Sequence, residues 1–253
     1  MKALSLIIGS LLALNVAQAT EIKSICGVDD RVPSSDPKIA RLVQSQGDGG
    51  CTATMIGRTC AITAGHCKSV MVLAEFNTPM SKNGNAVGSA PEDVYEIDQA
   101  SITYKNGGQG QDYAVFKIKP NAITGQYPGD VQGNYNVAFK TPKAGDRLRI
   151  TGHGVDYSDP ERHLAQQTHT GVMMPQSRWG KKDVLNYRVD TMGGNSGSSV
   201  ILEATDEIIG IHSHGGCSTS SSSKNSANAG TAIAQVPELV KAIQQCLADE
   251  ANL

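Results

Sequence analysis

Short apolar or alternating segments, separated by glycine, asparagine and proline, dominate the middle of the chain. Four of them have the length and side-chain pattern of β-strands, and they cover residues 70–76, 114–118, 148–151 and 207–211. The chain also contains 27 glycines, which is typical of many short strands joined by tight turns. These features predict an all-β protein whose core rests on valine, isoleucine, leucine and alanine.

The end of the chain carries the one clear helical pattern. Apolar residues recur there at helical spacing and form a single face: Val236, Leu239, Val240, Ile243 and Leu247. Pro237 suits the first turn of a helix, where a missing N–H is tolerated. We therefore predict a C-terminal helix over residues 236–253.

The first residues have the pattern of a signal peptide. Lys2 supplies a positive start, residues 4–16 are mostly apolar, and Ala17-Gln18-Ala19 is a small-x-small cleavage site. A membrane anchor is the alternative, but the apolar run is too short to span about 30 Å of hydrocarbon. We predict a signal peptide over residues 1–19 and a secreted protein, extracellular or periplasmic, without stable membrane association.

The remaining chain divides at a segment rich in turn residues. Residues 123–136 contain glycine, proline and asparagine and predict a linker between two halves, at 25–130 and 131–235. Residues 219–228 are rich in serine and asparagine and are typical of an exposed loop. The net charge is −2 and no long basic run occurs, so we expect no nucleic-acid partner. We further expect a monomeric protein.

Six cysteines in an exported chain favour three disulfides. Zinc is the competing interpretation, above all for His212-x-His214-x-x-Cys217, but this spacing is not a standard closed zinc set, and we expect no metal site. A bridge between Cys51 and Cys67 would pin the loop that holds His66. The residues alone leave the pairing of the other four open.

The candidate nucleophile is Ser196, which lies among glycines in the segment 192–200. Flanking glycines permit a tight turn whose N–H groups converge on one point, beside which a reactive hydroxyl can sit. The sequence Gly-Asn-Ser-Gly is also common in ordinary turns that have no catalytic role. Function is favoured because His66 and Asp112 precede the serine in the order of a known catalytic triad. A serine hydroxyl needs an imidazole as base, and the imidazole needs a carboxylate to orient it.

Taken together, these segments resemble the chymotrypsin/trypsin-fold serine proteases, and most of all the bacterial glutamyl endopeptidases. The resemblance covers nearly all of the chain after the signal peptide and rests on residues 27–31, 51–52, 55–57, 63–67, 112–113, 190–191, 193–198, 210–212 and 230–231. It implies two six-stranded antiparallel β-barrels with the active site in the cleft between them. It also implies peptide substrates, cleavage through an acyl-enzyme, and no cofactor.

The resemblance assigns roles residue by residue. His66 is the general base, Asp112 orients it, Ser196 attacks the peptide carbonyl, and the N–H groups of Gly194 and Ser196 form the oxyanion hole. The specificity pocket is implied to contain Thr191, His212 and Ser213, with Asp190 beside them. Two positions depart from the family: Asn195 replaces an aspartate found in many animal relatives, and Ser199 stands where proline is usual.

The resemblance also implies maturation and cross-links. A short pro-segment, residues 20–24, would be removed to give a chain that starts at Ile25, whose α-amino group helps to bind an acidic substrate side chain. The resemblance implies the disulfide Cys51–Cys67, and its placement of the mature N-terminus beside the specificity pocket favours Cys26–Cys217. We also predict Cys60–Cys246, which would tie the strand before His66 to the C-terminal helix.

Three functional alternatives follow. The first is cleavage after Glu or Asp, with His212 and Thr191 donating hydrogen bonds to the substrate carboxylate. The second is cleavage after Lys or Arg, because Asp190 lies six residues before Ser196, where trypsin-like enzymes keep a pocket carboxylate. The third is a binding protein on a protease scaffold, which the intact triad disfavours.

Overall fold

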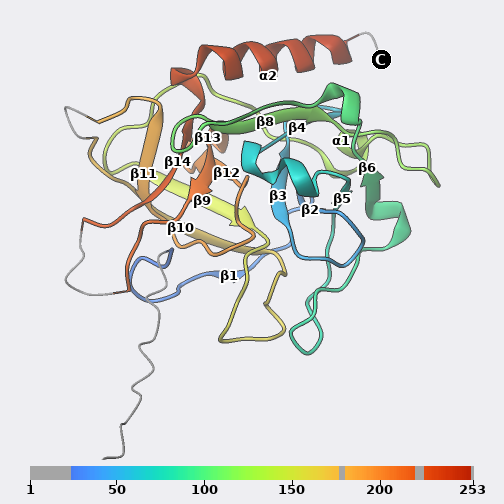
Figure 1. The fold of residues 1–253 in the computed structure, drawn as a ribbon, viewed down its shortest axis with the longest axis horizontal. Helices are drawn as coiled ribbons and strands as arrows, with labels where there is room; N and C mark the ends of the chain where they lie inside the picture. The colour runs from blue at the N-terminus through green and yellow to red at the C-terminus, as the bar shows by residue number, and fades with distance from the viewer. Residues whose placement is uncertain (1–23, 177–179, 220–224, 252–253) are drawn as a thin grey trace, which may run out of the picture.

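The computed structural model describes residues 24–176, 180–219 and 225–251. Two antiparallel sheets of seven strands lie side by side, and a helix covers one end of the molecule (Figure 1). The predicted signal peptide, and all of the predicted pro-segment except Ser24, lie outside the described residues. The all-β fold class and the C-terminal helix are confirmed.

The first sheet has the strand order β6-β5-β2-β3-β4-β8-β7. Its strands are β2 (Ile39–Val43), β3 (Cys51–Met55), β4 (Cys60–Thr63), β5 (Leu73–Glu75), β6 (Val94–Glu96), β7 (Thr103–Asn106) and β8 (Asp112–Lys117). Every residue of β2, β3 and β4 is buried, so both faces of these strands are covered. The resemblance implied a closed barrel of six strands here. Instead the sheet is curled and open, because its short edge strands β6 and β7 do not pair within the described residues.

The second sheet has the order β1-β10-β11-β14-β13-β12-β9. Its strands are β1 (Val32–Pro33), β9 (Arg147–Gly152), β10 (Gln167–Met173), β11 (Val184–Arg188), β12 (Ser199–Leu202), β13 (Glu207–His214) and β14 (Asn228–Ala232). An additional pairing of β9 with β10 closes six of these strands into a barrel, as predicted. The strand β1 comes from the N-terminal end of the chain but pairs with β10 of this sheet.

Three of the four strands predicted from the sequence are confirmed, in β8, β9 and β13. The fourth is wrong over its first half. A 3-10 helix, η1 (Gly65–Val70), precedes β5, and Met71 is fully buried at the end of this turn. The apolar residues at 70–71 therefore fill the core from a turn, and the Cys51–Cys67 bridge holds that turn against β3.

Short helices fill several connections. The predicted linker contains one α-helical turn, α1 (Pro128–Gln132), which begins at a proline. Three further 3-10 helices are η2 (Pro91–Asp93), η3 (Gln99–Ser101) and η4 (Ile233–Gln235). Part of the predicted loop at 219–228 lies outside the described residues, and its last residue begins β14.

Three disulfides join the six cysteines, and they are the three predicted pairs. Cys51–Cys67 closes a loop of 16 residues, whereas Cys26–Cys217 and Cys60–Cys246 join positions 191 and 186 residues apart. In the chain-entropy description, long closed loops restrict the unfolded chain most. The two long-range bridges also attach both ends of the described chain to the body of the protein.

The helix α2 (Pro237–Glu250) follows the second sheet but packs on β8 and β4 of the first. Its buried face contains Leu239, Ile243 and Cys246, as the periodicity predicted. Within the described residues, no helix is both long and apolar enough to cross a membrane.

Glu250, at the end of α2, satisfies the turn between β3 and β4. Its carboxylate accepts the N–H groups of Arg58, Thr59 and Cys60 at 2.9, 2.5 and 2.6 Å, and the Thr59 hydroxyl at 2.8 Å. Thr59 is buried, so these donors have little access to replacement water. The carboxylate is therefore a structural cap on the strand that leads to His66.

We expect Glu250→Ala to lower the free energy of unfolding by about 2 kcal/mol or more, because buried N–H groups lose their acceptor. Denaturant titration monitored by fluorescence measures this change. Gln244→Ala, at an exposed position of the same helix, is the matched control. A loss no greater than that of the control would contradict the assignment of Glu250 as a cap.

Candidate active site

His66 and Asp112 form a hydrogen-bonded pair. His66 lies in η1, and Asp112 is the first residue of β8. The Asp112 carboxylate lies 2.6 Å from His66 Nδ1 through one oxygen and accepts the His66 backbone N–H at 3.0 Å through the other. Burial acts to raise the pKa of Asp112, but the hydrogen bonds from His66 outweigh it and hold the pKa below its usual value. The ring thus stands beside an ionised, buried carboxylate with a third of the His66 side chain exposed.

The loop that carries Ser196 packs against the segment that carries His66. Gly197 has φ +88°, and a Cβ there would lie 2.0 Å from Thr63 Oγ1 and 2.3 Å from Thr52 O, so only glycine fits. The Thr52 N–H donates to Ser196 O at 2.8 Å. Cys67, next to His66, contacts the same carbonyl through its sulfur at 3.7 Å. Ser196 is half-buried beside this contact.

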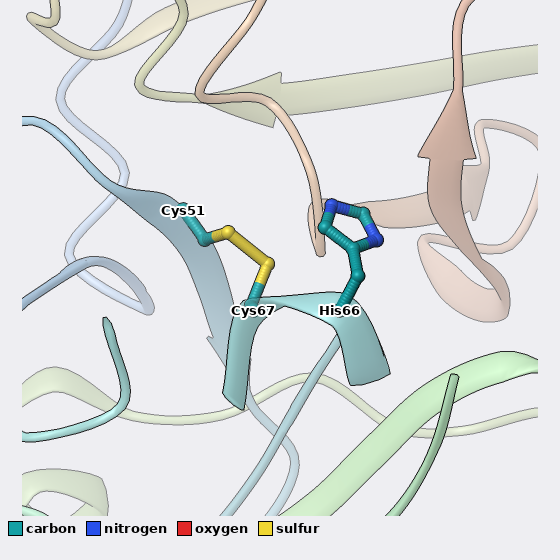
Figure 2. A group of neighbouring side chains, drawn as sticks. All are labelled: Cys51, His66 and Cys67. Atoms are coloured by element: carbon teal, nitrogen blue, oxygen red, sulfur yellow. A yellow bond between two sulfur atoms is a disulfide. The ribbon is translucent and has the colours of Figure 1, made fainter. Parts of the chain in front are cut away.

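A disulfide fixes the turn that contains His66. Figure 2 shows the Cys51–Cys67 bridge joining β3 to η1, with the His66 ring extending from the same turn. Both thiols are oxidised, so Cys51, His66 and Cys67 do not form a thiolate metal site although their ligand atoms are close.

Asn195 stabilises the serine loop through hydrogen bonds, at the position where many animal relatives have an aspartate. The Asn195 side chain is buried, and its Oδ1 accepts the Met192 N–H at 3.0 Å. The Asn195 N–H donates in return to Met192 O at 3.0 Å. The turn is therefore braced by neutral hydrogen bonds within the loop. Ser199, which stands where proline is usual in the family, begins β12 and pairs with Ile211.

Asp190 does not stand free in a pocket. The carboxylate is buried and accepts the backbone N–H groups of Cys26 at 2.7 Å and Asp30 at 3.1 Å. The Asp190 N–H donates to His169 Nδ1 at 2.7 Å. Asp30, His169 and Asp190 bring potential metal ligands together, but these contacts already engage both Asp190 oxygens and His169 Nδ1. Asp190 is directed at the N-terminal segment.

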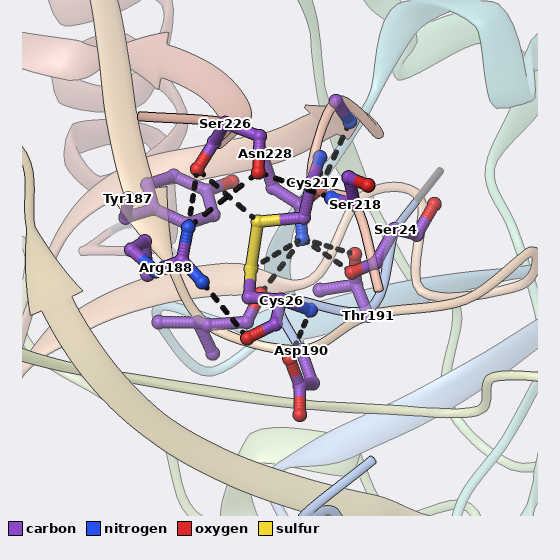
Figure 3. Close-up of a disulfide and its surroundings, with 12 residues drawn as sticks. Ser24, Cys26, Tyr187, Arg188, Asp190, Thr191, Cys217, Ser218, Ser226 and Asn228 are labelled. Atoms are coloured by element: carbon purple, nitrogen blue, oxygen red, sulfur yellow. Dashed lines mark hydrogen bonds between the residues drawn. A yellow bond between two sulfur atoms is a disulfide. The ribbon is translucent and has the colours of Figure 1, made fainter. Parts of the chain in front are cut away.

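Asn228 is a site residue that the sequence analysis missed. It is fully buried at the start of β14, and its amide nitrogen donates to Ser24 O at 2.7 Å and to Val189 O at 2.8 Å. Its oxygen accepts the N–H groups of Gly216 and Cys217. Figure 3 shows how Asn228, the Cys26–Cys217 bridge and Asp190 surround the N-terminal segment. The prediction that residues 219–228 form an exposed loop is wrong at Asn228, because this side chain pairs with backbone groups far away in the sequence.

The other predicted pocket residues lie on β13 and before the serine loop. Thr191 is fully buried, and its N–H donates to Ser24 O at 3.2 Å. Ser213 Oγ lies 2.8 Å from His214 Nδ1. The His214 ring stands edge-on to the His66 ring, with centroids 6.4 Å apart. His214 had been considered only as a zinc ligand, and its suggested partner Cys217 is bridged to Cys26.

His212 is almost completely buried, with 4% of its surface exposed. Its Nδ1 lies 2.7 Å from the Tyr187 hydroxyl, a contact that the sequence analysis also missed. Burial, reinforced by His214 and His66, lowers the pKa of His212 to about 3. The ring is therefore neutral at physiological pH.

The comparisons agree with this architecture. A family model described as Trypsin matches residues 25–236. The chain therefore belongs to the trypsin family of serine proteases. It is 26% identical over 212 residues to the glutamyl endopeptidase of Bacillus licheniformis, in a match that covers 77% of this chain and 62% of that relative. The chain thus spans less than two thirds of that relative's length.

Solved structures show the same fold. A Glu endopeptidase in complex with MPD superposes with a TM-score of 0.66 and 20% identity, covering 88% of this chain and 99% of that one. Neuropsin from mouse brain superposes with a TM-score of 0.62 and 19% identity, covering 83% of this chain and 95% of that one. At such identities the likeness establishes the fold.

Two buried histidines predict how stability depends on pH. Burial lowers the pKa of His153 to about 3, as it does for His212, whereas an unfolded histidine titrates near 6.5. Below pH 6.5 these two histidines bind protons in the unfolded chain but stay unprotonated in the folded chain. The contribution of these two neutral histidines to the free energy of unfolding is therefore fully present above pH 6.5. It decreases as the pH falls, by about 1.4 kcal/mol per pH unit for each histidine.

Denaturant titrations of the Ser196→Ala protein between pH 5 and 6.5 measure this slope. The carboxyl groups with lowered pKa values stay ionised in this window and do not contribute. His153→Gln removes one of the two histidines and should halve the slope. A free energy of unfolding that is constant across the window would refute the neutral, buried state of these rings.

Proposed function

We propose that the protein is a secreted serine endopeptidase that hydrolyses peptide bonds through an acyl-enzyme and cleaves after Glu, and secondarily after Asp. The observation that carries the proposal is the 2.6 Å contact of Asp112 with His66 beside the Ser196 loop, in a chain of the trypsin family. The disulfides and the bacterial relative support export from the cytoplasm. Its partners are protein or peptide substrates, and it acts as a monomer.

His66 acts as general base in this proposal. Because Nδ1 faces the Asp112 carboxylate, the other ring nitrogen is left to take the proton of the Ser196 hydroxyl as it attacks the substrate carbonyl. Asp112 stabilises the imidazolium that forms. The same ring then returns the proton to the leaving amine, and water hydrolyses the acyl-enzyme in a second round.

The serine loop supplies the oxyanion hole. The N–H groups of Asn195, Gly197 and Ser198 donate to protein carbonyls. Among the described residues, no protein acceptor takes the N–H groups of Gly194 and Ser196. These two donors can therefore stabilise the negative oxygen that develops on the substrate carbonyl.

The acidic preference is supported by the direction of Asp190. A carboxylate that accepts two backbone N–H groups of the N-terminal segment is not presented to a substrate Lys or Arg. His212 and Thr191 remain as donors for a substrate carboxylate, and a charged acceptor strengthens such hydrogen bonds. The relative named a glutamyl endopeptidase supports the same preference.

Removal of residues 20–24 completes the pocket in this proposal. In the uncut chain, the Ser24 carbonyl accepts the Thr191 N–H and the Asn228 amide. Cleavage before Ile25 withdraws this carbonyl and places an α-ammonium group among the same residues. The site then gains a positive charge for an acidic side chain.

We expect Ser196→Ala to lower kcat by about 10⁴-fold or more, because the nucleophile is lost while the fold is kept. Hydrolysis of a Glu-containing peptide measures the rate, and circular dichroism checks the fold. Ser198→Ala is the matched control, since its buried hydroxyl has no hydrogen-bond partner in the described residues. Full activity of Ser196→Ala would rule the mechanism out.

Matched peptides with Glu, Gln, Lys or Phe before the scissile bond test the specificity. Glu should give the highest kcat/KM, by about tenfold or more over Gln, which corresponds to about 1.4 kcal/mol of transition-state binding. The Lys peptide should give the lowest kcat/KM, because its ammonium group would face only hydrogen-bond donors in the pocket. Faster cleavage after Lys than after Glu would show that Asp190 determines the preference.

N-terminal sequencing of the active enzyme tests the maturation. The active form should begin at Ile25, and a form that begins at Thr20 should have a higher KM for Glu peptides because the pocket lacks the α-ammonium group. A Phe peptide is the control, since its side chain does not use that charge. Equal KM values for both forms on Glu peptides would contradict this step.

A further inference from the structure

The hydroxyl of Tyr187 faces the pocket histidine from inside the second barrel. Tyr187 lies on β11 and is fully buried, and its Oη is 2.7 Å from His212 Nδ1. The two rings lie 6.0 Å apart between centroids. The neighbouring strand leaves room for the hydroxyl, since a Cβ on Gly230 would stand 3.0 Å from it.

The direction of this hydrogen bond follows from which of the two groups can donate a proton and which can accept it. A buried hydroxyl must give its proton to an acceptor, or the desolvation of the O–H is not compensated. Within the described residues, the hydrogen-bond partner of the Tyr187 hydroxyl is His212 Nδ1. If Nδ1 carried a proton itself, the tyrosine proton would have no acceptor. Tyr187 therefore donates, and Nδ1 accepts.

A neutral imidazole that accepts at Nδ1 carries its proton at Nε2. We propose that Tyr187 is a positioning residue that locks His212 in the Nε2–H tautomer, so that the pocket offers a fixed, uncharged donor to the substrate side chain. This inference deepens the proposed acidic specificity and rests on it.

The surroundings keep His212 in this state. Burial is the main cause of its lowered pKa, and the charged or titratable groups that face it are His214, His66 and Asp112. Burial also raises the pKa of Tyr187 well above its usual value, so the hydroxyl keeps its proton. A donor of this kind selects substrates with an acceptor oxygen, and it leaves the recognition of charge to the α-ammonium group of Ile25.

The tautomer can be observed directly. Nitrogen-15 NMR of histidine-labelled Ser196→Ala protein should show His212 with an unprotonated Nδ1 and a protonated Nε2. Adding Tyr187→Phe should convert this signal to the Nδ1–H form or to a mixture. Adding Tyr95→Phe, which removes the hydroxyl of a buried tyrosine in the first sheet, should leave it unchanged. A protonated Nδ1 without the Tyr187 substitution, or an unchanged signal in Tyr187→Phe, would overturn the proposal.

Kinetics then separate positioning from a general structural role. In the active enzyme, Tyr187→Phe should raise KM for a Glu peptide about tenfold with little change in kcat, and should leave a Phe peptide unaffected. Equal losses on both peptides would mean that Tyr187 only supports the fold. The NMR measurement needs no peptidase activity, so an inactive wild-type chain would refute the proposed function without deciding the tautomer.

Discussion

Direct hydrogen bonds between the two sheets hold the site together, because the two sheets share no strand in the part of the chain that the structure describes. Thr52, on β3, donates its N–H to Ser196 O and its hydroxyl to Gly194 O at 2.9 Å. Thr231, on β14, exchanges hydrogen bonds with the Asp112 backbone at 2.9 and 3.3 Å. One threonine from each sheet thus fixes a functional segment of the other. The relative position of His66, Asp112 and Ser196 depends on these contacts.

Local patterns predicted much of this arrangement. The segments around His66, Asp112 and Ser196 indicated a triad because each is a short motif whose chemistry is written in adjacent residues. The helix α2 was predictable from its apolar spacing, and β8, β9 and β13 from their short apolar runs. In each case the physical cause lies within a few neighbouring positions.

The contacts that were missed join positions far apart in the chain. Asp190 meets Cys26 across 164 residues, and Asn228 meets Ser24 across 204. The partner of a buried polar group cannot be found from its neighbours in sequence, so the direction of Asp190 and the pairing of Tyr187 with His212 stayed open. The open first sheet has the same cause, because closure depends on whether two short edge strands meet in space.

Each end of the described chain packs on the sheet that the other half of the chain forms. The strand β1 from the N-terminal end completes the second sheet, while α2 from the C-terminal end contributes Leu239 and Ile243 to the core of the first. During synthesis, the first sheet emerges long before the helix that covers it. Its apolar face stays uncovered until α2 has been synthesised and can pack on it. The core of the first sheet is therefore complete only when α2 is present, and the Ser196 loop contacts this sheet through Thr52.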